Sequence, residues 1–212
     1  METLGVADLK AIVGRIAAIM SERRDELVRL DGAVGDGDLG LVMEKGFQSA
    51  RAEADASPEA DAGKLLMRVG MRIAKDAPST MGTLTATGFM AGGKAVTGHA
   101  SLGVAEMAAF FDAFVTGIMQ RGKAKPGEKT VVDVLYPAAQ ALKAAAGAGQ
   151  TLQEAFRACR AAAAEGLVRS TEAIAQHGRV AYYQEQSRGK VDPGSVAGTY
   201  IIQGFCDHIE GR

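Results

Sequence analysis

Three aspartates in a short glycine-rich segment have the clearest chemical potential in this chain. Asp31, Asp36 and Asp38 fall within eight residues that also contain Gly32, Gly35 and Gly37. Carboxylates that converge repel one another unless cations neutralise them, and oxygen-only donors favour Mg²⁺ or Ca²⁺. Glycine lets the main chain approach a ligand closely. The segment predicts a magnesium-phosphate site; the alternative is a solvated Asp-Gly turn, the usual role of an isolated pair.

The spacing of the acids excludes an EF-hand. The twelfth residue counted from Asp31 is Val42, and from Asp36 it is Phe47, whereas an EF-hand requires a bidentate Glu there. A metal at these aspartates would therefore keep open positions, which Mg²⁺ fills with water and substrate phosphates.

Length and composition indicate one globular domain. The chain has 212 residues, of which 47% are hydrophobic, and a net charge of −1, which disfavours disorder and nucleic-acid binding. No apolar run reaches the length of about twenty residues that spans a bilayer, and the amino terminus lacks signal-peptide form, so we expect a cytoplasmic protein without membrane association. The domain is placed at residues 1–208; residues 209–212 are either native or a protease-cleavage linker and are set apart.

Hydrophobic periodicity predicts an all-α protein. Leu9, Val13, Ile16 and Met20 recur at steps of three to four residues, as in an amphipathic helix. Helices are expected near 3–26, 41–56, 58–76, 83–97, 104–121, 131–147, 151–177 and 194–209. Only residues 83–87 and 180–183 offer short strand patterns. The expected architecture is an all-helical bundle or barrel.

Helix start signals accompany this periodicity. Ser57-Pro58 and Asp192-Pro193 each provide a cap followed by proline at the first helical position, and Thr151 with Glu154 has the form of a capping box. Cys159 and Cys206 are far apart and belong to no C-x-x-C pair, which predicts buried thiols.

Residues 88–95 imitate a phosphate-binding P-loop. They match G-x-x-x-x-G-K, but Ala95 stands where Ser or Thr would hold Mg²⁺. A P-loop also joins a strand to a helix, and this chain lacks alternating strands and helices. Gly88, Gly92 and Gly93 are therefore predicted to serve tight helix packing.

Four motifs, in order along the chain, resemble the nucleotide-binding L subunit of dihydroxyacetone kinases. Residues 31–47 contain Gly35-Asp36-Gly37-Asp38; residues 121–133 are similar to G-K-A-x-P-G-D-K-T-x-x-D; residues 178–182 are similar to G-R-A-S-Y; and residues 192–195 match D-P-G-A/S. The resemblance spans about four fifths of the chain. It implies an eight-helix antiparallel barrel with the nucleotide at one end.

The resemblance also implies roles for residues. Asp31, Asp36 and Asp38 match the aspartates that hold two Mg²⁺ ions on the phosphates of ADP or ATP. The family's nucleotide contacts fall on Leu39, Gly40, Leu41, Val42, Thr80, Met81, Gly122, Val131, Arg179, Asp192, Pro193 and Gly194. Arg179 is the candidate catalytic residue, because its permanent forked charge suits phosphate.

Physical chemistry adds expectations around these positions. Ser79, Thr80 and Gly82 can donate hydrogen bonds to phosphates, Leu84 and Val131 can sandwich adenine, and Thr130 can cap the helix that begins there. We expect Lys123, Lys125 and Lys129 to form a solvated basic rim. His99, His177 and His208 lie outside the motifs, and no catalytic role is assigned to them.

Three positions depart from the family pattern. Leu39 and Val42 stand where the family has His and Asn, and Met81 stands where it has Ser. Each departure removes a polar group near the nucleotide, which indicates a divergent branch with altered affinity, phosphate geometry or acceptor sugar.

The resemblance implies a partner chain. Family members bind the ketose on a separate K-type subunit or domain, so the expected function is that of a kinase subunit for dihydroxyacetone or a related ketose. The phosphoryl donor is either exchangeable ATP or a phosphotransferase-system protein that recharges bound ADP, and a homodimer is left open. The alternative is a non-catalytic, ADP-bound regulatory or adaptor module.

Overall fold

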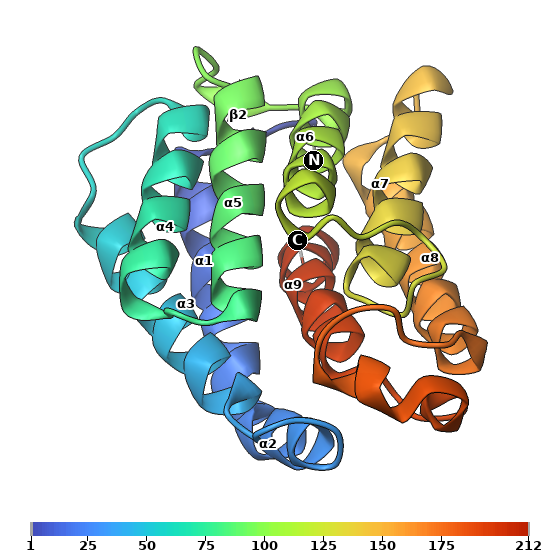
Figure 1. Ribbon diagram of the computed structural model, residues 1–212. Coiled ribbons are helices and arrows are strands. Elements are labelled where there is room, and N and C mark those ends of the chain that lie inside the picture. The colour runs from blue at the N-terminus through green and yellow to red at the C-terminus, as the bar shows by residue number, and fades with distance from the viewer. Residues whose placement is uncertain (1, 212) are drawn as a thin grey trace.

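The computed structural model describes residues 2–211, which contain nine α-helices, one 3-10 helix and two short strands (Figure 1). The α-helices are α1 (Val6–Glu22), α2 (Arg24–Gly32), α3 (Leu39–Ala56), α4 (Ala62–Asp76), α5 (Thr80–Ala95), α6 (Val104–Gly122), α7 (Val132–Gly147), α8 (Leu152–Glu172) and α9 (Pro193–Glu210). The remaining elements are β1 (Leu4–Gly5), β2 (Ser101–Leu102) and the 3-10 helix η1 (Arg179–Ser187).

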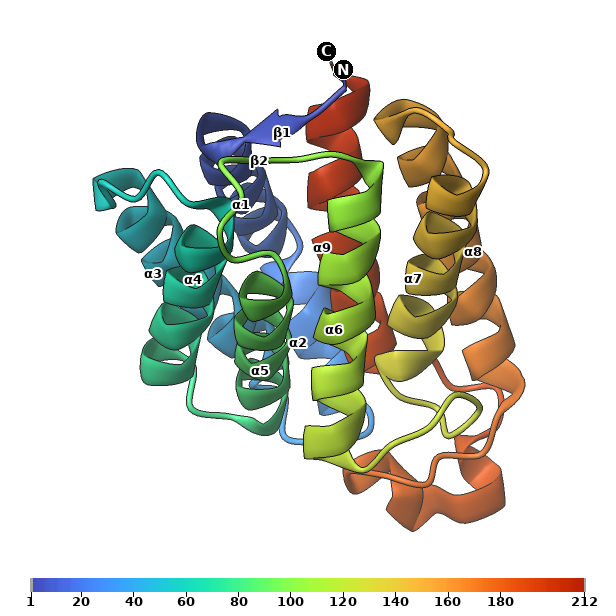
Figure 2. The same cartoon turned by 90° about the horizontal axis from the view of Figure 1, so that it is seen from above.

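Eight of these helices form a closed ring. In the order α1, α3, α4, α5, α6, α7, α8 and α9, each helix packs against the next, and α9 packs against α1. Consecutive helices run in opposite directions (Figure 2). β1 and β2 pair antiparallel, with Leu4 opposite Leu102, at one end of the ring, whereas α2 and η1 lie at the other end (Figure 1). The predicted all-α antiparallel barrel is confirmed.

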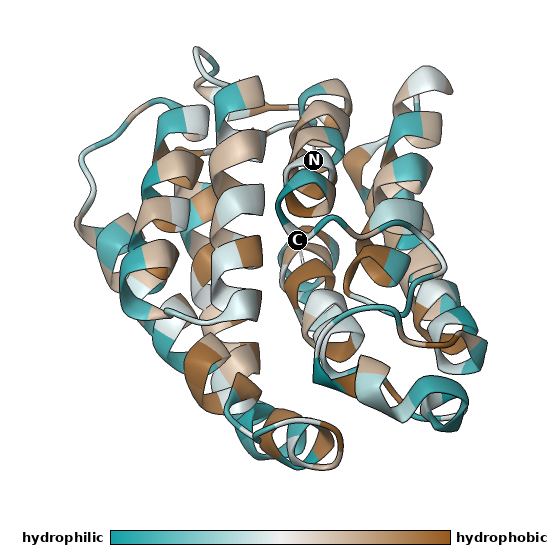
Figure 3. Cartoon of the chain, in the orientation of Figure 1, coloured by the Kyte–Doolittle hydropathy of each residue, from teal (hydrophilic) through white to brown (hydrophobic). Residues whose placement is uncertain are grey.

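Phenylalanine rings fill the interior of the barrel. Phe111 and Phe205 have ring centroids 5.1 Å apart, and Phe89 and Phe114 are 5.2 Å apart, both in edge-on geometry. Such pairs add about 0.5–1.5 kcal/mol beyond the burial of their area. Figure 3 shows hydrophobic residues banded along the ring helices, whereas η1 is mostly hydrophilic.

Glycines in α5 allow the phenyl rings to approach. A Cβ atom at Gly88 would lie 2.9 Å from ring atoms of Phe114, and one at Gly92 would lie 2.6 Å from Cδ2 of Phe110. The packing role predicted for this segment is confirmed. The P-loop reading is excluded, because residues 88–95 lie inside a helix.

The predicted helix at 3–26 is wrong in its length. The chain forms β1, then α1, and breaks at Arg23 before α2. The apolar stripe is interrupted at the break, because after Met20 the next fully buried side chain is Leu27. The helix predicted at 151–177 also ends early, at Glu172.

Two predicted starts and both strand patterns are corrected. α4 begins at Ala62 rather than after Ser57-Pro58, because the Asp61 carboxylate accepts hydrogen bonds from the N–H groups of Lys64 (3.0 Å) and Gly98 (2.8 Å). Residues 83–87 are helical, since α5 begins at Thr80. Residues 180–183 belong to η1.

The other caps are as predicted. The Asp192 carboxylate accepts a hydrogen bond of 2.6 Å from the Ser195 N–H, with Pro193 at the first position of α9, and Thr151 forms its capping box with Glu154. Cys159 and Cys206 are buried free thiols. Within residues 2–211, no helix combines the length and apolarity needed to cross a bilayer. α9 extends through Ile209, which is fully buried.

Candidate functional site

A pocket of about 430 Å³ opens at the end of the barrel that carries α2 and η1. It is lined by parts of residues 31–39, 78–84, 129–131, 177–180 and 192–194. These segments include the starts of α3, α5 and α9, with α7 beginning directly after the third. The amino-terminal end of a helix carries a partial positive charge and free N–H groups. This convergence of helix starts favours an anionic ligand.

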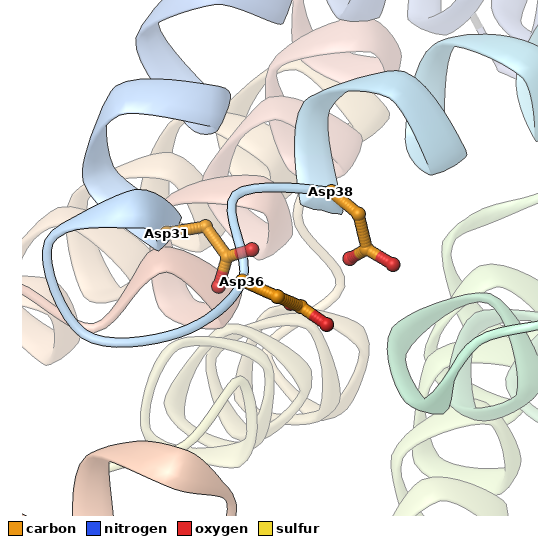
Figure 4. A group of neighbouring side chains, drawn as sticks. All are labelled: Asp31, Asp36 and Asp38. Atoms are coloured by element: carbon orange, nitrogen blue, oxygen red, sulfur yellow. The ribbon is translucent and has the colours of Figure 1, made fainter.

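The three aspartates converge at one side of this pocket. Asp31 lies in α2, Asp36 in the following loop and Asp38 immediately before α3 (Figure 4). One carboxylate oxygen from each lies within 4.8 Å of those from the other two. The convergence expected from their spacing is therefore present in the structure.

The loop is held in shape by its glycines and by the Asp31 backbone. The Asp31 carbonyl accepts hydrogen bonds from the N–H groups of Val34 (3.0 Å) and Gly35 (2.5 Å). A Cβ atom at Gly35 would lie 2.6 Å from Oδ1 of Asp31, so any larger residue would collide with the carboxylate. Gly37 has φ = +77°, a conformation that favours glycine. The loop sequence thus fixes where the carboxylates point.

The electrostatics of the cluster are unfavourable without a cation. Partial desolvation raises the pKa of Asp38, although its side chain is exposed, and the negative charges of Asp36 and Asp31 raise it further. Asp38 occupies the position before α3, yet its side chain makes no capping hydrogen bond. Arg179 supplies one opposing charge, with Nη2 2.6 Å from Oδ2 of Asp36.

The residues fit a bound Mg²⁺ ion. The donors are all carboxylate oxygens, the hard ligands that Mg²⁺ prefers, and their mutual repulsion would be relieved by a divalent cation. Exposed carboxylates leave room for the water and phosphate ligands that Mg²⁺ normally retains; Asp36 and Asp38 are both exposed.

The opposite wall of the pocket is formed by α5, α7 and α9. Ser79 caps α5, and its Oγ accepts a hydrogen bond of 3.0 Å from the Gly82 N–H. Thr130 Oγ1 accepts one of 3.2 Å from the Val132 N–H, but the capping position of α7 is Val131, one residue after the predicted cap Thr130. Asp192 is buried, and burial raises its pKa to about 6 despite hydrogen bonds from Ser195.

Most of the residues predicted for the site line the pocket. They are Asp31, Asp36, Asp38, Leu39, Ser79, Thr80, Met81, Leu84, Thr130, Val131, Arg179, Asp192, Pro193 and Gly194. Leu39 and Met81 are 7% and 8% exposed. The departures from the family pattern at these two positions thus replace polar groups with apolar surface in the pocket wall.

Five predicted residues do not line the pocket. Gly40 packs against the backbone of α2, where a Cβ atom would meet the Arg24 carbonyl, and Val42 packs against the core. Gly82 turns toward the Ala77 carbonyl, and Gly122 lies beside Leu84. Leu41 is 55% exposed.

The expectation of a solvated Lys129 is wrong. Lys129 is 1% exposed and lines the pocket, whereas Lys123 and Lys125 are exposed as expected. Its Nζ donates to the carbonyls of Ser170 (2.7 Å) and Thr171 (3.0 Å). The sequence gives two hints: Lys129 matches the second lysine of the G-K-A-x-P-G-D-K-T pattern, and it directly precedes the pocket residues 130 and 131.

Several other lining residues were not predicted. They are Val34, Gly35, Pro78, His177, Gly178 and Val180. Val34, Ala175 and Val180 form a small apolar cluster separate from the main core, which joins the aspartate loop to the segment that carries Arg179. His177 Nε2 lies 2.7 Å from Oε2 of Glu128. The position of His177 immediately before the Gly178-Arg179 motif is the signal that could have identified it.

Comparison with known proteins gives consistent matches over most of the chain. The DAK2 domain family matches residues 33–207. The ADP-binding subunit DhaL of a PEP-dependent dihydroxyacetone kinase from Escherichia coli K12 is 31% identical over 190 residues, covering 89% of this chain and 90% of that subunit. An L-erythrulose kinase from Pectobacterium atrosepticum is 31% identical over 202 residues, covering 91% of this chain and 34% of that kinase.

A solved structure has the same fold. The crystal structure of a dihydroxyacetone kinase from C. freundii in complex with AMP-PNP and Mg²⁺ superposes with a TM-score of 0.71 at 23% identity, covering 93% of this chain and 33% of that one. The chain thus spans about a third of the length of these larger kinases. The family match and the similarity to the E. coli subunit show that the chain belongs to the DAK2 domain family.

Proposed function

We propose that this chain is the ADP- or ATP-binding subunit of a kinase for dihydroxyacetone or a related short-chain ketose. The observation that carries the proposal is the pocket in which three converging carboxylates and Arg179 face the starts of helices. Relatives support it: two are named as ADP-binding subunits of dihydroxyacetone kinases, and a third is named as an L-erythrulose kinase.

Asp31, Asp36 and Asp38 would hold two Mg²⁺ ions. When bound, these ions supply neutralisation of the negative charge on the phosphates. Arg179 and the starts of α5 and α9 add fixed positive charge around the same phosphates. Leu84 and Val131 offer apolar surface to the base. In this proposal the phosphates would lie beside the aspartate loop and the base between α5 and α7.

The ketose would be bound by a separate K-type subunit that docks at the mouth of the pocket. Apolar side chains are exposed at this end: Tyr182 and Tyr183 in η1 are 88% and 39% exposed, and Leu41 in the first turn of α3 is 55% exposed. Exposed aromatic side chains are enriched at protein interfaces. The donor is either exchangeable ATP or a phosphotransferase-system protein that recharges ADP bound in the pocket.

Reconstitution tests this proposal. The purified chain should bind ADP with Mg²⁺ in calorimetry and transfer no phosphate to a ketose alone. Adding the cognate K-type subunit should produce transfer, followed as ADP release or as phosphoenolpyruvate consumption over three- to five-carbon ketoses. Ketose kinase activity from this chain alone would contradict the split mechanism.

A regulatory or adaptor module is the second candidate function. Leu39 and Met81 favour it, since they make the pocket wall less polar than the family pattern. Inactivity with every ketose despite a well-formed complex and bound ADP would support this candidate.

A further inference from the structure

Lys129 is a buried cation that the proposed phosphate chemistry does not use. Its side chain is among the largest that are fully buried, at 1% exposure, and its backbone has φ = +59°. A buried ammonium carries a desolvation cost, and the left-handed region is unfavourable for a non-glycine residue. Both costs fall on one residue at the wall of the pocket, where such strain is commonly associated with function.

The hydrogen bonds of Lys129 lie at the start of the segment that carries Arg179, residues 173–191. Nζ donates to the Ser170 and Thr171 carbonyls in the last turn of α8, where this segment begins. The Thr171 carbonyl also accepts a hydrogen bond of 2.8 Å from the Gly189 N–H, close to the point where the segment ends. The Thr171 carbonyl thus connects the Lys129 ammonium to residues at the start and near the end of segment 173–191.

Charge adds a second link to the returning chain. Burial lowers the pKa of Lys129, but the carboxylates of Asp192, Glu172 and Asp133 oppose that shift. Asp192 caps α9 at the end of the segment, and the charge of Lys129 in turn favours its ionised form. The ammonium therefore also acts on the helix start that contributes to the pocket.

The backbone around Lys129 ties the same segment to the loop before α7. The Glu128 carbonyl accepts a hydrogen bond of 3.2 Å from the Gln176 N–H, three residues before Arg179. The Thr130 carbonyl accepts one of 2.9 Å from Ser195 Oγ in α9. Lys129 lies between Glu128 and Thr130, whose carbonyls accept these hydrogen bonds, and its side chain donates to the carbonyls at the end of α8.

We propose that Lys129 is a positioning residue: its ammonium fixes both ends of residues 173–191 and so holds Arg179 and the start of α9 toward the phosphates. This inference rests on the proposed function for its effect on catalysis, but not for its effect on the segment itself. Two measurements test the effect on the segment and the effect on catalysis separately.

The first measurement is amide hydrogen exchange on the free protein. Lys129→Met keeps the length and apolar stem but removes the charge and donors. It should speed exchange at Ala175, Gln176 and Gly189, whose N–H groups bond within or across the segment, by tenfold or more, while the interior of α5 stays protected. Lys123→Met is the matched control, since Lys123 also has positive φ (55°) and an exposed side chain. Equal exchange in both variants would overturn the proposal.

The second measurement is a double-mutant cycle on the reconstituted complex. If Lys129 acts through Arg179, Lys129→Met should lower the transfer rate by about tenfold in the wild-type background and by less than about threefold beside Arg179→Ala, because coupled residues are not additive. Additive losses would overturn the positioning role. Failure of the wild-type complex to transfer phosphate would instead count against the proposed function, and the exchange result would stand apart from it.

Lys129→Gln keeps the test decisive if the Met variant does not fold. Its amide retains two N–H donors for the carbonyls but no charge, so exchange should increase at the same amides by a smaller factor. Full protection of residues 173–191 in a folded Gln variant, together with wild-type transfer, would contradict a role for the ammonium.

Discussion

The interior of the barrel and its pocket end are built on opposite principles. Inside the ring, Phe89, Phe110 and Phe205 are each at most 1% exposed and meet neighbouring rings at ordinary packing distances. At the pocket end, the negatively charged side chains of Asp36 and Asp38 lie close together. The ammonium group of Lys129 is buried there as well. The first arrangement stabilises the native state, whereas the second costs free energy until a ligand or metal compensates it.

Backbone strain follows the same division. Within residues 2–211, the non-glycine residues with positive φ are Lys123, Lys129 and Gln184. All three lie in the connections that lead to or cover the pocket. Sparsely populated conformations persist where the surrounding structure overdetermines them, and they cluster at functional sites. Perturbations of the ring should therefore change stability, and perturbations of the pocket end should change binding.

The largest expected effect is on the ring. Phe110→Ala removes a ring that contacts Phe89, Phe111, Phe114 and Phe205. It should lower the free energy of unfolding by about 3–5 kcal/mol, measured by denaturant titration, while the ADP affinity of the folded fraction stays unchanged. Tyr182→Ala is the control, because Tyr182 is 88% exposed and should change stability by less than about 0.5 kcal/mol. A loss of ADP affinity in the Phe110 variant would contradict the separation of the two regions.

The next effect is on the reaction. Arg179→Ala should lower the transfer rate of the reconstituted complex by about 10² or more, as for other groups that stabilise charge in the transition state, with an unchanged helical circular dichroism spectrum. Arg169→Ala is the matched control, since the side chains of Arg169 and Arg179 are both 62% exposed and each pairs with a carboxylate. Equal rates for the two variants would remove Arg179 from the mechanism.

The aspartate cluster should show opposite effects on binding and stability. Asp38→Asn should weaken ADP binding in the presence of Mg²⁺ by at least tenfold, about 1.4 kcal/mol, in calorimetry. Without metal, the same change should leave the protein slightly more stable, because it removes one of three repelling charges. Asp36→Asn should behave alike toward ADP. Asp25→Asn is the control, with a side chain 86% exposed outside the cluster. Unchanged affinity in both cluster variants would exclude the metal site.

Local patterns predicted the ring well because its elements depend on periodicity and capping. α9 begins where Asp192-Pro193 indicated, and the aspartates converge as their spacing implied. The start of α4 was not predicted, because Asp61 is held as the helix cap partly by a hydrogen bond from the Gly98 N–H, and Gly98 is distant in sequence. The break at Arg23 falls where the run of buried side chains is interrupted between Met20 and Leu27.

The position of Lys129 could not be predicted from its neighbours. In sequence it stands among Lys123, Lys125 and Glu128, a pattern typical of a solvated loop. Its burial arises from carbonyls at the end of α8, roughly forty residues away. Charged residues are rarely buried unless paired, so residue type alone predicts exposure, although Lys129 matches the second lysine of the G-K-A-x-P-G-D-K-T pattern. Only the packing of the loop before α7 against α8 reveals it.

The smallest expected effect compares two helix caps at opposite ends of the barrel. Burial raises the pKa of Asp192, at the pocket end, from 3.8 to about 6. For Asp61, at the other end, burial opposes ionisation, but hydrogen bonds from the N–H groups of Lys64 and Gly98 hold its pKa below 3.8. Asn can cap a helix in place of Asp without the charge, so Asp→Asn variants isolate the effect of ionisation at each end.

The two variants should therefore show opposite pH dependence. Between pH 3.8 and about 6, folded Asp192 holds a proton that the unfolded chain has released, so wild type should lose stability relative to Asp192→Asn as the pH rises through this range, and then level off. For Asp61 the unfolded chain holds the extra proton, so wild type should gain stability relative to Asp61→Asn as the pH rises toward 4. Urea titrations from pH 3.5 to 7.5 measure both differences. Parallel curves for the two variants would show that ionisation of Asp192 at the pocket end has no greater electrostatic cost than ionisation of Asp61 at the opposite end.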